Sequence, residues 1–240
     1  MQVEGTVIIC DTIDDVGVTI LKKAGLIVNY KPDIESNELL SAVRECDVIV
    51  VRSRTKITKA VIDAAPNVKI IARVGVGLDN IDTDYAESKG IKVLNAAEAA
   101  MNAVSELVIG HMLALSRNIP KASDGIKNGK WLKKELVGGE LRGKYLGIIG
   151  VGNIGRNVGR IAKCLRMNLI GYDIFPINQD YVREVGMIKT DLKTLLENSD
   201  FVTCHVPLTE ETRHLINSET LSYMKPTSFL INTSRGEIID

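Results

Sequence analysis

The chain has 240 residues, of which 45% are hydrophobic and 25% charged, and its 30 basic and 30 acidic residues cancel to a formal net charge of zero. This length suits one large or two ordinary domains, and the composition is typical of a globular protein. The balanced charge and the few aromatic residues argue against a nucleic-acid-binding surface. The chain has no run of about 18 apolar residues, so we expect no membrane-spanning helix.

The cysteines are scattered along the chain and form neither a CxxC pair nor a zinc-type spacing with histidine: Cys10, Cys46, Cys164 and Cys204. We therefore expect no metal site. Three of them border apolar runs and are interpreted as small core residues. Free thiols fit a reducing compartment, and the N-terminus shows no basic segment followed by a long apolar one. These features predict a cytoplasmic protein.

The first third of the chain alternates short apolar runs with amphipathic segments. Strands are expected at 6–10, 26–30, 47–51, 69–74 and 91–94, and helices at 14–24, 36–45, 58–65 and 83–89. Ser36 is expected to cap the second of these helices. The alternation predicts a parallel sheet with helices on both faces, in a domain that ends near residue 95.

A long helix is expected from Met101 to Arg117. Its apolar residues spread over more than one face, which is typical of a deeply buried helix or of one in an oligomer interface. His111 lies within this helix and is interpreted as a core residue. A second helix follows Pro120, and residues 128–143, rich in Gly, Lys and Glu, are expected to form a loop.

A glycine-rich turn follows the next expected strand, at 145–149. Gly150, Gly152 and Gly155 occupy the three glycine positions of GxGxxG, and a helix is expected at 153–165. In such a turn the first glycine permits the bend, the second lets a pyrophosphate approach and the third lets helix and strand pack closely. The phosphate lies at the helix N-terminus, where free N–H groups and the helix dipole favour an anion. The turn therefore predicts a dinucleotide site; the alternative is a glycine turn without a ligand.

Asp173 comes 18 residues after Gly155, at the end of an expected strand at 168–172. A carboxylate there would accept hydrogen bonds from an adenosine ribose and repel a 2′-phosphate, so NAD is favoured over NADP. Further strands are expected at 200–204 and 228–232, and further helices at 191–197 and 218–223.

Arginines and glycines follow two strands of the first third. Arg52, Arg54 and Arg73 lie at strand ends, where open α/β sheets bind ligands. Guanidinium groups suit carboxylate or phosphate because they donate two parallel hydrogen bonds. The segment Gly75–Gly77 can offer backbone N–H groups as an anion nest. The alternatives are a solvent-exposed charged loop and an ordinary glycine turn.

Two further candidates follow strands of the second half. Arg235 comes after the strand at 228–232, and a cation there can hold a carboxylate and polarise a neighbouring carbonyl. His205 ends the strand at 200–204 and is expected to line the nucleotide crevice. No Asp or Glu at a recognisable spacing orients it, so a general-base role is not favoured. His214 lies in a polar turn and is expected at the surface.

Together these residues resemble the D-isomer-specific 2-hydroxyacid dehydrogenase family. The resemblance runs from about residue 5 to residue 240 and is carried by Val51–Thr55, Arg73–Asp82, Ala103–Arg117, Leu146–Gly155, Cys204–Pro207 and Ile231–Asp240. It implies an α/β fold with two doubly wound parallel-sheet domains. The first, at 1–95, would be a flavodoxin-like substrate-binding domain; the second, at 96–240, would be a Rossmann NAD-binding domain, incomplete at its C-terminus.

The resemblance also implies an activity, the NAD-dependent oxidation of a 2-hydroxy acid by hydride transfer. Gly75, Val76 and Gly77 would hold the substrate carboxylate, Val76 would also approach the nicotinamide, and Arg235 would be the catalytic arginine. The cofactor would be contacted by Gly150, Gly152, Asn153, Ile154 and Gly155 at the pyrophosphate, by Asp173 at the ribose, by His205, Val206 and Pro207 on the adenosine side, and by Thr233, Ser234 and Arg235 at the nicotinamide end.

The substrate is favoured to carry a phosphate, bound by Arg52, Ser53, Arg54 and Arg73, with Lys133 or Lys134 as a further ligand. Family members dimerise where the helix at 103–117 lies, so a homodimer or higher oligomer is expected. The family's proton-transferring histidine and its orienting glutamate follow the catalytic arginine and are absent from these 240 residues. We therefore expect a C-terminally truncated dehydrogenase. The alternatives are a dehydrogenase for a smaller acid, such as glyoxylate or lactate, and a catalytically inactive NAD-binding regulatory protein.

Overall fold

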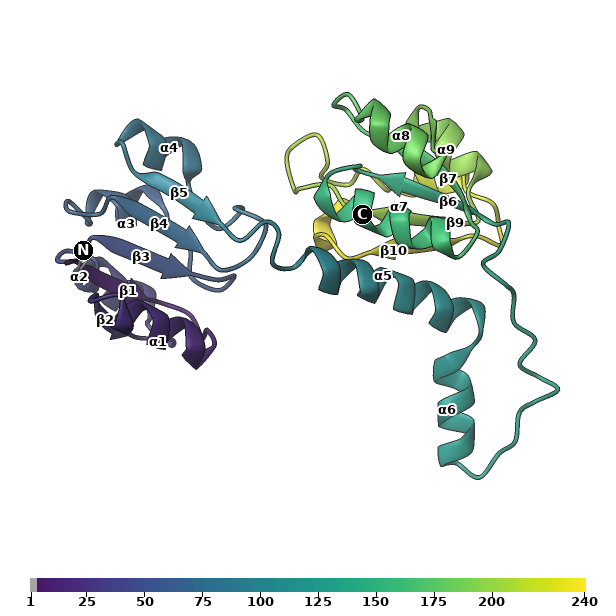
Figure 1. Ribbon diagram of the computed structural model, residues 1–240, viewed down its shortest axis with the longest axis horizontal. Coiled ribbons are helices and arrows are strands. Elements are labelled where there is room, and N and C mark those ends of the chain that lie inside the picture. The colour runs from purple at the N-terminus through teal and green to yellow at the C-terminus, as the bar shows by residue number, and fades with distance from the viewer. Residues whose placement is uncertain (1–3) are drawn as a thin grey trace. The chain divides into compact units, whose positions relative to one another are not determined.

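The computed structural model describes residues 4–240, which fall into two compact units, one that ends at Ala100 and one that runs from Met101 to Asp240 (Figure 1). Each unit contains a parallel sheet of five strands. No helix within residues 4–240 combines the length and the apolar character that crossing a membrane requires.

The first unit has the strand order β2-β1-β3-β4-β5, with β1 (Thr6–Ile9), β2 (Ile27–Tyr30), β3 (Val48–Val51), β4 (Ile70–Arg73) and β5 (Lys92–Asn95). Its helices are α1 (Asp15–Lys23), α2 (Ser36–Ala42), α3 (Lys59–Asp63) and α4 (Thr83–Ser88). Leu39, Val61 and Ala86 bring α2, α3 and α4 to one face of the sheet, and Val18 and Leu21 bring α1 to the other. The β-branched strands suit this cover on both faces, and the predicted alternation is confirmed.

The second unit has the order β10-β9-β6-β7-β8, with β6 (Tyr145–Ile149), β7 (Asn168–Tyr172), β8 (Ile188–Lys189), β9 (Phe201–Cys204) and β10 (Phe229–Asn232). Its helices are α5 (Met101–Ser116), α6 (Ile119–Lys127), α7 (Asn153–Cys164), α8 (Gln179–Val185), α9 (Leu192–Asn198) and α10 (Ser218–Ser222), and a short 3₁₀ turn lies at Gly236–Ile238. One face is covered by α5, α7 and α8 and the other by α9 and the residues after α10. The expected α/β fold is therefore confirmed.

Two elements lie where the sequence had predicted none. Asn178 caps the start of the helix α8, where its side chain accepts hydrogen bonds from the N–H groups of Asp180 and Tyr181, and Gly186, with φ +68°, caps its end. The strand β8 has two exposed residues, which is too short for an apolar pattern. The Asn cap and the terminal Gly were the available signals for α8.

Three side chains depart from the sequence-based expectations. Ser36 is the first residue of α2 rather than its cap; Glu35 holds that place and makes no side-chain cap bond. His111 is exposed, so its interpretation as a core residue is wrong. The helical repeat turns it about a quarter of a turn from the buried line of Val108 and Met112. Cys164 is exposed, whereas Cys10, Cys46 and Cys204 are buried as interpreted.

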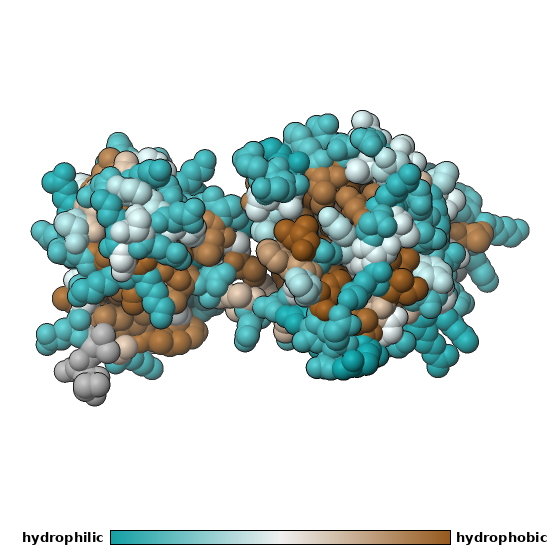
Figure 2. All heavy atoms as spheres, turned by 90° about the horizontal axis from the view of Figure 1, so that it is seen from above, coloured by the Kyte–Doolittle hydropathy of each residue, from teal (hydrophilic) through white to brown (hydrophobic). Residues whose placement is uncertain are grey.

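Apolar side chains remain exposed on both units, and brown areas are visible on the face drawn in Figure 2. On α5 the outer side chains Leu107 and Leu115 are 51% and 42% exposed, while Val108 and Met112 are fully buried. The broad apolar surface expected for this helix is therefore divided between the core and the outside. His214 is exposed, as expected.

Candidate nucleotide and substrate sites

Four strands of the second unit end at the same level. The register pairs Asn232 with Cys204, Cys204 with Ile149, and Ile149 with Tyr172. The residues that leave the sheet together are therefore Thr233, His205, Gly150 and Asp173. Because neighbouring strands lie about 4.8 Å apart, the glycine turn has Asp173 on one side and His205 on the other. The fold thus brings the sequence-predicted nucleotide residues to one edge.

The three glycines of the turn occupy different surroundings. Gly150 has φ +88°, and a Cβ there would lie 2.8 Å from the carbonyl carbon of His205. A Cβ at Gly155 would lie 2.1 Å from the carbonyl oxygen of Gly150, so α7 packs on the turn only because this residue is glycine. A Cβ at Gly152 would have no protein atom within 4 Å. Two glycines therefore serve packing, and the third borders open space.

That open space lies at the N-terminus of α7. The helix has twelve residues, and its cap residue, Gly152, provides no side-chain hydrogen bond. The first N–H groups of a helix have no acceptor within the helix, and its dipole favours a negative charge. Room at Gly152 and an uncapped helix end together fit a pyrophosphate group. Asn153 lies in the first turn, where its Oδ1 accepts a hydrogen bond from Arg156 at 2.8 Å.

The carboxylate of Asp173 is fixed beside the turn. Its Oδ2 accepts a hydrogen bond from the N–H of Val151 at 2.7 Å, and its Oδ1 accepts one from the N–H of Phe175 at 2.9 Å. Each oxygen keeps a further acceptor position, which suits the hydroxyls of a ribose. Ile174 and Phe175, each 73% exposed, follow directly. This apolar pair was not among the sequence-predicted site residues; its position directly after Asp173 was the available signal.

His205 is partly buried and has no carboxylate among its hydrogen-bond partners within residues 4–240. Its backbone N–H donates to Ile149 at 2.7 Å, and its Nε2 lies 3.0 Å from Oγ1 of Thr203. Burial lowers the pKa of His205 to about 4, so the ring is neutral at pH 7. The surroundings of His205 therefore provide neither a carboxylate to orient the ring nor a pKa near neutral pH, as a general base needs. The two residues after His205 are held by the second unit. Val206 packs against the core, and the carbonyl of Pro207 accepts a hydrogen bond from the hydroxyl of Thr212 at 2.6 Å.

The loop that carries Arg235 is tied to two strands. Oδ1 of Asn232 accepts from the N–H of Ser234 at 2.9 Å, and Nδ2 of Asn232 donates to the carbonyl of Arg235 at 2.7 Å. The hydroxyl of Ser234 donates to the carbonyl of Cys204 at 2.7 Å. Oγ1 of Thr233 is buried and has no hydrogen-bond partner in the described part of the chain. A buried polar atom without a partner calls for an explanation, and an acceptor supplied by a bound ligand is one. Asn232 was not among the sequence-predicted site residues.

Three strands of the first unit also end in register, with Val51 beside Arg73 and Arg73 beside Asn95. Nε of Arg73 donates to the carbonyl of Arg52 at 3.3 Å, and its Nη2 donates to the hydroxyl of Ser53 at 3.3 Å. The structure therefore brings Arg52, Ser53 and Arg73 together at the carboxyl end of this sheet.

The surroundings of Arg54 differ from those of Arg52. Its guanidinium donates to the carbonyls of Ile34 at 3.1 Å, Cys10 at 2.7 Å and Pro32 at 2.7 Å. Its Nε also lies 3.3 Å from Oδ1 of Asp11. Four of the five donors of a guanidinium are accounted for by these partners. This geometry favours a structural role for Arg54 over the substrate contact that the sequence suggested.

Two carbonyl groups of the segment Gly75–Gly77 are bound by residues at and just after the end of β5. The carbonyl of Gly75 accepts from the N–H of Ala96 at 2.9 Å, and the carbonyl of Val76 accepts from Nδ2 of Asn95 at 2.6 Å. In a trans peptide the N–H points opposite to the carbonyl. The N–H groups of Val76 and Gly77 therefore point away from Asn95 and Ala96.

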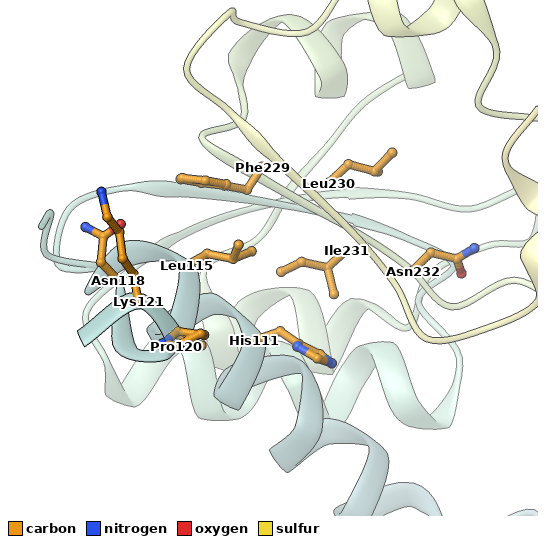
Figure 3. A pocket seen from close by; sticks show the side chains of 10 residues that line it. His111, Leu115, Asn118, Pro120, Lys121, Phe229, Leu230, Ile231 and Asn232 are labelled. Carbon is orange, nitrogen blue, oxygen red and sulfur yellow. The ribbon is translucent and has the colours of Figure 1, made fainter. Parts of the chain in front are cut away.

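One cavity of about 570 Å³ lies away from the glycine turn. It is lined by α5, the start of α6 and the strand β10, which pairs with β9 on one side only (Figure 3). His111, Leu115, Phe229 and Ile231 are among its lining side chains. It contains no residue of the glycine turn and shares only Asn232 with the candidate sites described above.

Comparisons with known proteins agree with this architecture. The chain is 44% identical over 234 residues to D-3-phosphoglycerate dehydrogenase from Synechocystis sp., which covers 98% of this chain and 42% of that protein. It is 49% identical over 207 residues to hydroxypyruvate reductase from Thermotoga maritima, which covers 86% of this chain and 66% of that protein. The chain thus spans well under half the length of the first relative and about two thirds of the second.

Among solved structures, D-lactate dehydrogenase from Aquifex aeolicus complexed with NAD and lactic acid superposes with a TM-score of 0.86 at 30% identity, over 98% of this chain and 70% of that one. Residues 109–240 match the family model described as D-isomer specific 2-hydroxyacid dehydrogenase, NAD binding domain. The chain therefore belongs to the D-isomer-specific 2-hydroxyacid dehydrogenase family, and its second unit contains the family's NAD-binding domain.

Proposed function

We propose that the protein takes part in the NAD-dependent oxidation of a 2-hydroxy acid. The observation that carries the proposal is the common level at which β6, β7, β9 and β10 end, since it places the glycine turn, Asp173 and the Arg235 loop on one edge. Bound NAD supplies the acceptor for the hydride that leaves the substrate carbon.

The residues of the second unit are assigned as follows. The N–H groups of Asn153 and Ile154, at the open end of α7, bind the pyrophosphate, and Asp173 binds the adenosine ribose. His205, Val206 and Pro207 line the adenosine side. Thr233, Ser234 and Arg235 lie toward the nicotinamide, and the orphaned hydroxyl of Thr233 supports a ligand contact there.

The chemical step is assigned in part. The guanidinium of Arg235 holds and polarises the oxygen on the reacting carbon, which stabilises the carbonyl as it forms. The hydroxyl proton must also leave. His205 has a pKa of about 4 and no carboxylate partner within residues 4–240, so we assign it no proton transfer. The described residues thus supply binding and polarisation, while the general base is not assigned among them.

The first unit is proposed to bind the acid. The N–H groups of Val76 and Gly77 bind its carboxylate, since their carbonyls are turned toward Asn95 and Ala96. Arg52 and Arg73, joined through the carbonyl of Arg52, favour an acid with a phosphate. We therefore propose D-3-phosphoglycerate as substrate and 3-phosphohydroxypyruvate as product, in the phosphorylated route to serine. The name of the Synechocystis relative supports this choice.

A second candidate substrate is a small acid without the phosphate. The name of the Thermotoga relative, hydroxypyruvate reductase, favours it. Steady-state assays of the full-length protein with NAD and D-3-phosphoglycerate or D-glycerate separate the two. We expect a higher kcat/KM for the phosphorylated acid; a higher value for D-glycerate would overturn the assignment. Binding of NADH without turnover of any 2-hydroxy acid would instead support a regulatory protein.

A homodimer is proposed as the assembly, and the exposed Leu107 and Leu115 on α5 support it, because a helix that is apolar on its outer side suits an interface. Light scattering that gives a monomer would overturn it. Three buried free thiols support a reducing compartment, such as the cytoplasm.

A further inference from the structure

The Arg52–Thr55 loop of the first unit is held on one side by Asp11. This residue follows β1 and is 3% exposed. Its Oδ2 accepts hydrogen bonds from the N–H groups of Arg52 at 2.5 Å and Thr55 at 3.4 Å, and its Oδ1 accepts from the hydroxyl of Thr55 at 2.7 Å. A buried carboxylate requires such donors together with a cation. Arg54 provides the cation, so its guanidinium stabilises the buried carboxylate of Asp11 and thereby the loop.

Asn80 holds the same loop from the other side. Its Nδ2 donates to the carbonyl of Arg52 at 2.9 Å and to the carbonyl of Thr55 at 2.7 Å. Both amide protons are therefore used, one at each end of the loop. Its Oδ1 is buried and accepts no hydrogen bond within residues 4–240. The hydrogen bonds that the Asn80 side chain makes to the loop are therefore the two that its Nδ2 donates.

Asn80 also connects two proposed substrate segments. It lies three residues after Gly77, on the segment that continues from the proposed carboxylate nest. The carbonyl of Arg52 that it binds is also the acceptor of Nε of Arg73. The loop with Arg52 and the strand with Arg73 therefore share one fixed carbonyl.

The backbone of Arg52 is consequently fixed at both its polar groups, its N–H by Asp11 and its carbonyl by Asn80 and Arg73. The side chain of Arg52 is exposed, and its Nη1 donates to the carbonyl of Thr12 at 3.2 Å. Further N–H groups of this guanidinium remain for a ligand. A fixed backbone limits where these groups can point, which lowers the entropy lost when an anion binds.

We propose that Asp11 and Asn80 are positioning residues for phosphate recognition: they hold the backbone of Arg52 so that its guanidinium addresses the phosphate. The inference rests on the proposed role of Arg52 and Arg73. Asp11 and Asn80 do not touch the substrate themselves; they act through the Arg52–Thr55 loop. Loss of either one therefore weakens binding of the phosphate without affecting the cofactor.

The test compares Asn80→Ala and Asp11→Asn in the full-length protein, with D-3-phosphoglycerate and D-glycerate as substrates. Each variant should raise KM for the phosphorylated acid about tenfold, the equivalent of one or two hydrogen bonds. Values of kcat, and of KM for NAD and D-glycerate, should stay within about twofold. Asn67→Ala is the matched control, since its Nδ2 also donates to a backbone carbonyl of this unit, that of Arg44.

Two additional variants separate positioning from general destabilisation. In the Arg52→Ala background, Asn80→Ala should raise KM by less than about twofold more, because the route through Arg52 is already lost. A full additional tenfold rise would overturn the inference. Asn80→Thr keeps one hydroxyl donor and should fall between Asn and Ala. Should Asn80→Ala fail to fold, Asn80→Thr decides, and equal KM increases for both acids would overturn the inference.

The outcomes distinguish this inference from the proposed function. A wild-type protein that oxidises neither acid, or prefers D-glycerate, overturns the proposed substrate and with it the inference. If wild type prefers the phosphorylated acid and Arg52→Ala abolishes the preference, the proposed function stands. An unchanged preference in Asn80→Ala would then overturn the positioning role alone.

Discussion

The guanidinium of Arg73 lies directly over Gly75. A Cβ on Gly75 would lie 1.9 Å from Nη1 of Arg73 and 2.6 Å from its Cζ, and Gly75 has φ +152°. The N–H of Gly75 also donates to the carbonyl of Arg73 at 2.9 Å. Because Gly75 has no side chain, the guanidinium of Arg73 can occupy this place. Two proposed substrate contacts, Arg73 and the carboxylate-binding segment Gly75–Gly77, therefore depend on this glycine.

Gly75→Ala is therefore expected to displace Arg73 and to strain the backbone. We expect the strain to lower the free energy of unfolding by about 1–3 kcal/mol. Because Arg73 is displaced, we also expect KM for the 2-hydroxy acid to rise about tenfold, the equivalent of about 1.4 kcal/mol of binding. NADH affinity, measured by fluorescence titration, should not change. Gly90→Ala, which has φ +73° and no atom within 4 Å of its Cβ, is the control for strain alone. Equal KM values in both variants would contradict the role of Arg73.

The glycine turn offers a matched pair of substitutions. Gly152→Ala places its Cβ in open space, so the protein should unfold at the wild-type temperature but bind NADH about tenfold or more weakly. Gly155→Ala forces its Cβ onto the carbonyl of Gly150 and should lower the free energy of unfolding by about 2 kcal/mol or more. Thermal unfolding and NADH titration check both. Normal NADH affinity in Gly152→Ala would remove the pyrophosphate from this turn.

Asp173→Asn tests cofactor selectivity. The amide keeps one acceptor oxygen but loses the charge that repels a 2′-phosphate. We expect the ratio of NAD to NADP affinity to fall about tenfold or more, by titration with the two reduced cofactors. Asp191→Asn is the control, because that carboxylate also accepts a backbone N–H, from Thr194 at 2.9 Å, in the same unit. An unchanged ratio would mean that Asp173 serves only to hold Val151.

The pH dependence of stability should reflect His205. Burial lowers its pKa to about 4 from the ordinary 6.5, so between these values the unfolded chain binds the extra proton and the folded chain does not. Stability is therefore retained above pH 6.5 and lost as pH falls from there toward 4. The loss is at most about 3 kcal/mol, since each tenfold change in proton affinity corresponds to about 1.4 kcal/mol.

His205→Gln removes this proton-linked loss. Denaturant unfolding at pH 7 and pH 5 should show a smaller decrease for the variant than for wild type, and NMR titration of the wild-type ring should give a pKa near 4. A ring that titrates near 6.5 would contradict its burial. His214→Gln, an exposed histidine, should leave the acid-side loss in place.

The sequence predicted most strands because they are short, largely apolar runs, of which Val48–Val51, preceded by Asp47, is a clear case. The GxGxxG turn was predictable because its chemistry is local: Gly150 and Gly155 are required by atoms a few residues or one strand away. By contrast, α8 lacks a long apolar repeat, and His111 was misplaced because a helix apolar on several sides does not show which side is buried.

The sequence could not separate Arg52 from Arg54. Both arginines follow the same strand, and only the tertiary structure shows that Arg54 binds carbonyls at Cys10, Pro32 and Ile34. Asp11 and Asn80 were missed for a similar reason. Asp11 lies 41 positions and Asn80 lies 28 positions from Arg52, whose backbone they bind. No local spacing in the sequence therefore indicates these hydrogen bonds. Long-range hydrogen bonds to backbone groups leave no pattern in one sequence.

The uncapped start of α7 has a consequence for the lifetime of the protein. With Gly152 as its cap residue, the first turn must find its acceptors in water or in a bound anion. The pyrophosphate of a bound dinucleotide would accept hydrogen bonds from the first N–H groups of α7. At a concentration 100 times its Kd, the dinucleotide would add about 2.7 kcal/mol to the free energy of unfolding. Cofactor-free molecules would open this turn more often, so a protease would remove them first, and the pool of intact protein would follow the supply of nucleotide.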